Sequence, residues 1–169
     1  MTPENPGAEP FFLGAPGSQR FCVFHPPAGG KCFGAVLVAP PFGDELNKSR
    51  RMLAMQARRL AALGFGVLQL DLEGCGDSDG ELRDVRWASW KSDLAAGADW
   101  LDARLNAPVY LLGLRMGALL ALDFGEVALP PDYGYPLRVR VPTKLGFKNP
   151  KHIVEIFVTN DNPGGYWED

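Results

Sequence analysis

Short apolar runs alternate with amphipathic stretches along the first part of the chain. Residues 19–27 and 33–39 have the pattern of strands, and the second run is apolar without alternation, which is typical of a strand covered on both faces. The same reasoning predicts buried strands at 65–72 and 109–114.

Between these strands, two stretches carry apolar residues at helical spacing. The first runs from Asn47 to Leu63 with interleaved arginines, and Gly64 is placed to end it. The second runs from Trp87 to Leu105, and we interpret Trp87 and Trp90 as core packing rather than as part of a cofactor site. Strands that alternate with helices of this length predict an α/β fold with a mostly parallel, doubly wound sheet.

The pattern changes toward the end of the chain. A proline-rich connector at 129–136 is followed by alternating β-type runs at 137–141 and 153–159, with no helix between them. We therefore predict two unrelated partial domains, residues 1–125 and residues 126–169, the second an irregular β-type tail.

Composition places the chain among ordinary globular proteins, with 46% hydrophobic and 22% charged residues in 169. The formal charge of −3 gives no reason to expect nucleic acid as a partner. No signal peptide is recognisable at the start and no run approaches the ~18 apolar residues of a membrane span, so we expect a cytoplasmic protein.

The cysteines are three in number and fit no metal-ligand spacing. We interpret Cys22 and Cys32 as incidental thiols of a reducing compartment. Cys75 lies in a glycine-rich loop, where site chemistry is the alternative.

Residues 108–122 carry the strand, turn and helix pattern of a nucleophile elbow, G-x-S-x-G. Arg115 stands at its centre, between Gly113 and Gly117, where a serine is expected. A guanidinium stays protonated and has no lone pair to offer a carbonyl group, so Arg115 occupies the nucleophile position without being a nucleophile.

Two further segments accompany this elbow: Asp71–Ser78, with the pattern D-x-x-G-x-G-x-S after a strand, and Asn47-Lys-Ser-Arg-Arg51. Together with Gly113–Ala118 they resemble the α/β-hydrolase superfamily and, more narrowly, the exosortase A system-associated hydrolase 2 family over about residues 10–122. The resemblance implies a partial α/β-hydrolase fold, truncated after the elbow strand and helix. Members belong to bacterial gene clusters for exopolysaccharide and protein sorting, and their substrate is undefined.

In α/β-hydrolases two backbone amides form the oxyanion hole, one after an early strand and one after the nucleophile. By this resemblance the donors are the amides of Phe42 and Met116. The alternative is that residues 39–51 form only a polar loop that opens a helix.

A complete triad cannot be assembled from this chain. The acid and the histidine of the family follow the nucleophile, and only His152 follows Arg115. His25 precedes the elbow beside two prolines, where a structural role is expected. We therefore expect a catalytically incomplete hydrolase homologue, or pseudoenzyme.

Two roles remain open for Arg115. At the amino end of a helix it would add positive charge to a site for a small anionic or acyl ligand or a partner. Alternatively, it pairs with a loop acid, for which Asp44, Glu45 and Asp77 are the candidates.

The tail, about residues 128–169, resembles the carboxyl part of the molybdopterin-binding domain of sulfite-oxidase-like oxidoreductases. This resemblance implies that Arg138, Lys148 and Lys151 contact the anionic pterin, and Tyr133 stands where relatives often have histidine. The metal-ligating cysteine of that family lies upstream of the matching segment. We expect no bound cofactor in this chain and interpret molybdopterin as implied by resemblance only; a solvated basic hairpin or a chimeric reading frame is the alternative.

A sheet that ends with the strand at 109–114 exposes the edge of that strand. Unpaired strand edges pair readily with other strands. We therefore predict self-association through this edge unless 137–141 or 153–159 pairs with it.

Overall fold

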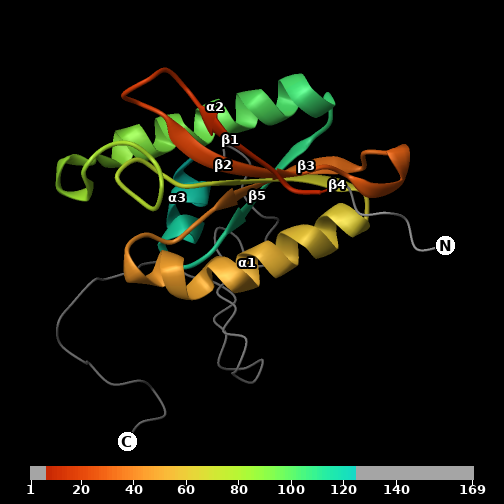
Figure 1. Ribbon diagram of the computed structural model, residues 1–169, viewed down its shortest axis with the longest axis horizontal. Coiled ribbons are helices and arrows are strands. Elements are labelled where there is room, and N and C mark those ends of the chain that lie inside the picture. The colour runs from red at the N-terminus through yellow and green to blue at the C-terminus, as the bar shows by residue number, and fades with distance from the viewer. Residues whose placement is uncertain (1–6, 125–169) are drawn as a thin grey trace, which may run out of the picture. The chain divides into compact units, whose positions relative to one another are not determined.

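The computed structural model describes residues 7–124, which form a five-stranded sheet with helices on both faces (Figure 1). The strands are β1 Glu9–Leu13, β2 Arg20–His25, β3 Gly34–Ala39, β4 Phe65–Leu70 and β5 Val109–Gly113. The α-helices are α1 Asp44–Ala62, α2 Trp87–Leu105 and α3 Met116–Phe124, and short 3-10 turns occur at Ala28–Gly30 and Leu82–Asp84.

The strand order is β1-β2-β4-β3-β5. Strand β3 runs parallel to both β4 and β5, whereas β1–β2 and β2–β4 are antiparallel pairs. The predicted α/β class is confirmed, and the hairpin β1–β2 extends the sheet on one side. Strand β1 was not predicted because Pro10 interrupts its short run, and a proline is tolerated there because β1 is an edge strand.

The side chains of β3 point alternately to the two faces of the sheet, and both faces are covered by helices. Ala35, Leu37 and Ala39 belong to a core that includes residues of α2 and α3, whereas Val36 and Val38 pack with residues of α1. Side chains that follow one another in a strand point to opposite faces, so an apolar strand without alternation needs cover on both.

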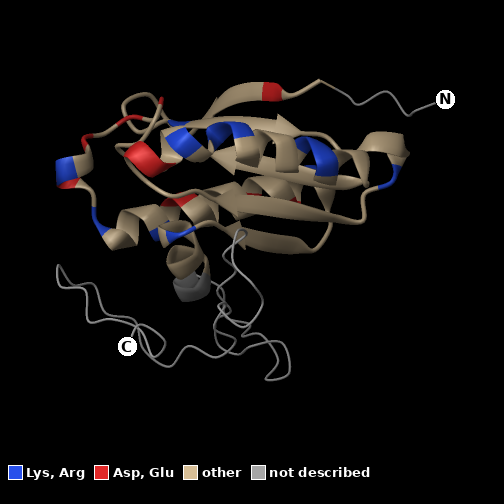
Figure 2. Cartoon of the chain, turned by 90° about the horizontal axis from the view of Figure 1, so that it is seen from below, with Lys and Arg blue, Asp and Glu red and all other residues tan. Residues whose placement is uncertain are grey.

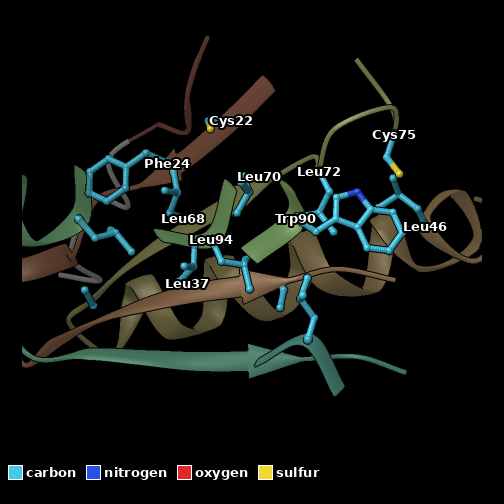
Figure 3. Close-up of a cluster of buried hydrophobic side chains, with 14 residues drawn as sticks. Cys22, Phe24, Leu37, Leu46, Leu68, Leu70, Leu72, Cys75, Trp90 and Leu94 are labelled. Carbon is cyan, nitrogen blue, oxygen red and sulfur yellow. The ribbon is translucent and has the colours of Figure 1, made fainter. Parts of the chain in front are cut away.

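The larger core lies between the sheet and α2 (Figure 3). Its labelled members come from β2, β3, α1, β4, the loop that follows β4, and α2: Cys22, Phe24, Leu37, Leu46, Leu68, Leu70, Leu72, Cys75, Trp90 and Leu94. Trp90 is buried as predicted, and its Nε1 donates to the carbonyl oxygen of Glu73 at 3.0 Å. Trp87 corrects the prediction in part, because it is 40% exposed at the start of α2, where its ring lies 6.2 Å from that of Trp90.

Helix α1 begins at Asp44, three residues before the predicted start at Asn47. This first turn carries the acidic residues Asp44 and Glu45, and its Leu46 is buried seven residues before Leu53, so it extends the apolar stripe. Acidic side chains are stabilising at a helix N-terminus, where backbone N–H groups are unpaired. Gly64 follows the helix with φ +89°, as expected for the residue that ends it.

None of the helices in the described part of the chain is long and apolar enough to cross a membrane. The predicted strands at 137–141 and 153–159 and the predicted domain 126–169 lie outside the described residues.

Candidate functional site

The predicted elbow is present in the structure. Strand β5 ends at Gly113, helix α3 begins at Met116, and Arg115 between them has φ +56°. The turn is tight, because the amide of Gly117 donates to Leu114 O and the amide of Ala118 to Arg115 O, both at 3.0 Å. A left-handed conformation is costly for a residue with a side chain, so the turn holds Arg115 in a strained conformation.

Both glycines of the elbow are required by close backbone contacts. A Cβ atom on Gly113 would collide with the backbone of Ala118, and one on Gly117 would collide with the carbonyl oxygen of Ala39. Because Gly117 has no side chain, the first turn of α3 lies directly against the end of β3, at Ala39 and Pro40. The elbow and the loop after β3 therefore meet at one edge of the sheet.

The guanidinium of Arg115 pairs with the carboxylate of Glu45, with 2.6 Å between Nη1 and Oε1. Glu45 is one of the three acids named from the sequence as partners. The side chains are 66% and 44% exposed, and an ion pair this exposed contributes only ~0–1 kcal/mol. A stronger anionic ligand can therefore replace Glu45 at small cost.

The two predicted oxyanion-hole amides lie in the loop after β3 and at the start of α3. Within residues 7–124, neither Phe42 N nor Met116 N donates a hydrogen bond. The ring of Phe42 lies 5.4 Å from that of Trp90, which anchors the loop to the core. Their role as oxyanion donors remains a prediction, and both amides are available for it.

The Asp71–Ser78 loop is held together by its own side chains. Asp71 Oδ2 accepts a hydrogen bond from Arg50 Nη2 at 2.8 Å, and Gly76 lies so close that a side chain there would collide with this carboxylate. Ser78 Oγ donates to Asp71 O at 2.6 Å and accepts from Phe21 N at 2.9 Å. The motif therefore shapes the carboxyl edge of β4, and its serine is fully engaged.

A second polar network, which was not predicted, ties this loop to α2. Arg20 Nε donates to Asp93 Oδ1 at 2.7 Å, and Asp93 Oδ2 accepts from the amide of Glu73 at 2.7 Å. Burial raises the pKa of Asp93, although the Glu73 amide and Arg20 act in the opposite direction. The sequence signals only that Asp93 is buried, because Asp93 lies three residues after Trp90 on the buried stripe of α2, and it gives no signal for the partner Arg20.

The described cysteines and histidine have structural surroundings. Burial raises the pKa of Cys22 to about 12, and burial likewise raises the pKa of Cys75 above its ordinary value. His25 is buried, its Nε2 lies 3.0 Å from Gln69 Oε1, and burial lowers its pKa. No cluster of three or more potential metal ligands occurs within residues 7–124.

Comparison with protein families gives a match to the oxidoreductase molybdopterin binding domain over residues 72–167, more than half of the chain. The chain belongs to this family. The match begins far upstream of the predicted segment 128–169 and includes Cys75, so the resemblance is longer than the tail alone.

Two curated relatives are similar to part of the chain. The putative protein-methionine-sulfoxide reductase subunit YedZ1 of Azospira oryzae is 58% identical over 50 residues, which are 30% of this chain and 19% of the relative. The protein-methionine-sulfoxide reductase catalytic subunit MsrP of Campylobacter jejuni is 43% identical over 65 residues, which are 35% of this chain and 22% of the relative. The chain thus spans about a fifth of the length of these relatives.

Among solved structures, the chain is similar to XC6422 from Xanthomonas campestris, described as a member of the α/β serine hydrolases without a lid. The TM-score is 0.59 at 22% identity, over 70% of this chain and 56% of that one. The described residues therefore have a partial α/β-hydrolase fold. Residues 72–124 belong both to this fold and to the range of the family match.

The described part of the matched range does not fit a molybdenum cofactor. Cys75 is the one cysteine in the range, and its buried thiol is kept protonated by burial. The charges of Asp71 and Asp93 raise its pKa further, whereas a backbone hydrogen bond with Gly43 and the charge of Arg50 act in the opposite direction. The predicted pterin contacts Arg138, Lys148 and Lys151 lie outside the described residues.

Proposed function

We propose that this chain is a catalytically inactive α/β-hydrolase-type protein, related to the exosortase A system-associated hydrolase 2 family, that binds an anionic ligand at its elbow. The observation that carries this proposal is Arg115 at the apex of the turn, in the left-handed conformation. The narrower relationship to that family is supported by the three sequence motifs, of which two form the elbow and the loop after β4.

Ester cleavage by the usual route requires an activated nucleophile and a general base. Arg115 supplies no nucleophile, and the hydroxyl of Ser78 is hydrogen-bonded within its own loop. His25 lies on β2 with Nε2 bound to Gln69, so no described imidazole serves the elbow. Binding without turnover is therefore the function that this edge of the sheet supports.

Three features favour an anion, such as a short carboxylate. The guanidinium of Arg115 is mobile enough to exchange partners, because its pair with Glu45 is exposed. The amides of Phe42 and Met116 have free N–H groups in the described part of the chain. The N-terminus of α3 adds a favourable dipole. Glu45 then acts as the internal competitor of the ligand.

Calorimetric titration of the full chain with butyrate and with inorganic phosphate tests this proposal. We expect Arg115→Ala to weaken binding by about tenfold and Glu45→Gln to strengthen it, because an Arg–carboxylate contact is a charge-assisted hydrogen bond. Arg59→Ala, on the exposed side of α1, is the control and should leave affinity unchanged. Equal affinities in wild type, Arg115→Ala and Arg59→Ala would reject the anion site.

An ester assay tests the absence of turnover. Neither wild type nor Arg115→Ser should release p-nitrophenol from its butyrate ester faster than buffer, because restoring a serine does not restore its base. Turnover by the wild-type chain would reject the proposal of an inactive hydrolase.

Family membership supports a second function, that of a molybdopterin-binding part of an oxidoreductase related to the methionine-sulfoxide reductases. In this proposal Arg138, Lys148 and Lys151 hold the anionic pterin, since basic side chains suit its phosphate. The full chain, produced in a host that makes the cofactor, should then copurify with pterin fluorescence. Replacing the three basic residues by glutamine should abolish that signal, and a signal equal in both proteins or absent from wild type would reject this function.

A further inference from the structure

A groove of about 280 Å³ lies on the α1 face of the sheet. Most of its wall is apolar and comes from strands β2, β3 and β4 and from helix α1, with Phe21, Val23, Val38, Leu53, Ala54 and Leu70 as its main apolar residues. None of Phe42, Arg115 and Met116 lines it, although Pro40, against which the first turn of α3 lies, does.

The groove exists because α1 does not cover the whole of this face. Helix α1 packs Leu53 and Ala57 against Val36, Val38 and Val67 of β3 and β4. Strand β2 lies on the far side of β4 from β3, and its residues Phe21 and Val23 are only partly buried.

The apolar wall is interrupted by polar residues, namely His25, Arg50, Arg58, Gln69 and Asp71. His25 is buried at the end of β2, and its Nε2 is occupied by Gln69 Oε1. Its other ring nitrogen, Nδ1, makes no hydrogen bond within residues 7–124. In that part of the chain, every fully buried side-chain nitrogen and oxygen has a hydrogen-bond partner. Nδ1 is therefore not completely sealed, and His25 is one of the residues that line the groove.

Arg58 on α1 supplies a positive charge at the same groove. It is exposed and makes no ion pair with any described residue, unlike Arg50, which is bound to Asp71. Viewed from the α1 side, basic residues form bands along this helix (Figure 2). Arg58 and His25 line the same groove. Burial lowers the pKa of His25 and the charge of Arg58 lowers it further, although the hydrogen bond with Gln69 acts in the opposite direction.

We propose that this groove binds an amphipathic carboxylate, such as a medium-chain fatty acid, with its alkyl chain against Val23 and Leu53 and its carboxylate at Arg58. An apolar wall with a few convergent polar groups is the usual composition of a small-molecule site. The unpaired guanidinium of Arg58 selects a negative charge and is the contact that holds the carboxylate, because the Nε2–H of His25 donates to Gln69 Oε1 and leaves Nδ1 of the neutral ring without a proton to donate. The proposal does not depend on the function of the elbow.

Titration of the full chain with octanoate, compared with octan-1-ol as the neutral probe, tests the site. Arg58→Gln removes the charge, and Arg59→Gln is the matched control, because Arg59 is the adjacent arginine and does not line the groove. We expect octanoate to bind the wild type more tightly than octan-1-ol. Arg58→Gln should weaken octanoate binding by about fivefold or more and Arg59→Gln by less than about twofold.

Ala54→Phe is a second variant, which fills the groove from α1 without altering any charge. It should abolish binding of both probes while the far-ultraviolet circular dichroism and the melting curve show a folded protein. Equal octanoate affinities in Arg58→Gln and Arg59→Gln, octan-1-ol binding as tight as octanoate, undiminished binding by folded Ala54→Phe, or no octanoate binding by wild type would each overturn the proposal.

Discussion

Arg20 on β2 donates its Nε–H to Oδ1 of Asp93 on α2 across 2.7 Å, which connects a strand to a helix 73 residues away in the sequence. Both side chains are almost completely buried, at 11% and 8% exposure. Asp93 also accepts the amide of Glu73, so the same carboxylate fixes the loop that follows β4. The pair therefore orders three segments that periodic patterns cannot relate to one another.

Removing one partner of this buried ion pair should lower the free energy of unfolding much more than removing one partner of an exposed ion pair does. Arg20→Met leaves the Asp93 carboxylate buried without its cation, and we expect a loss of about 3–5 kcal/mol in the free energy of unfolding. The double variant Arg20→Met with Asp93→Leu leaves only the Glu73 amide unpaired, at about 1–3 kcal/mol. Urea unfolding should find the double variant more stable than Arg20→Met; additive losses would show that the two side chains are not coupled.

The raised pKa of Asp93 gives the protein a pH dependence of defined sign. The native state retains this proton at pH values where the unfolded chain, with an ordinary value near 3.8, has released it. The contribution to stability is therefore fully present below that ordinary value and is lost as the pH rises through the raised native value.

Asp93→Asn lacks this titration and isolates it from those of other carboxylates. The difference in free energy of unfolding, wild type minus variant, should fall as the pH rises above about 3.8. A difference that rises with pH would mean that Arg20 and the Glu73 amide outweigh burial at Asp93.

At the apex of the elbow, glycine should be tolerated better than alanine. Arg115 has φ +56°, a conformation that costs a residue with a Cβ about 1–2 kcal/mol. Its ion pair with Glu45 is exposed and offsets little of this conformational free energy. Arg115→Gly removes the strain and the pair together, whereas Arg115→Ala removes the pair and keeps the strain. In thermal unfolding we expect the glycine variant to exceed the alanine variant by about 1 kcal/mol; equal values would contradict the left-handed conformation.

The features predicted correctly from the sequence are those that repeat or that require glycine. Strands β3 and β4 and helix α2 followed from apolar periodicity, and the elbow followed from Gly113 and Gly117, whose close contacts leave no room for a side chain. Prediction failed where a contact joins distant residues, as for Arg20 with Asp93, which no local pattern encodes. The choice of Glu45 among the three acids likewise depends on where α1 begins, and α1 begins three residues before the predicted start at Asn47.

The two edges of the sheet differ in their protection against pairing with a second copy of the chain. The β1 edge contains Pro10, which cannot donate a ladder hydrogen bond, and Glu9, which pairs with Arg104. Strand β5, Val-Tyr-Leu-Leu-Gly, has no charge and no proline, and among the described strands it pairs only with β3. Charges and prolines are the usual means of blocking edge pairing, so self-association should proceed through β5.

Tyr110 on β5 and Phe12 on β1 provide a matched test of the two edges, because both aromatic side chains are 53% exposed. Sedimentation velocity of the full chain should show concentration-dependent association in wild type. Tyr110→Lys should weaken it by about tenfold, since like charges on paired edges repel, while Phe12→Lys should leave it unchanged. A wild type that stays monomeric, or equal effects of the two lysines, would show that β5 is not the associating edge.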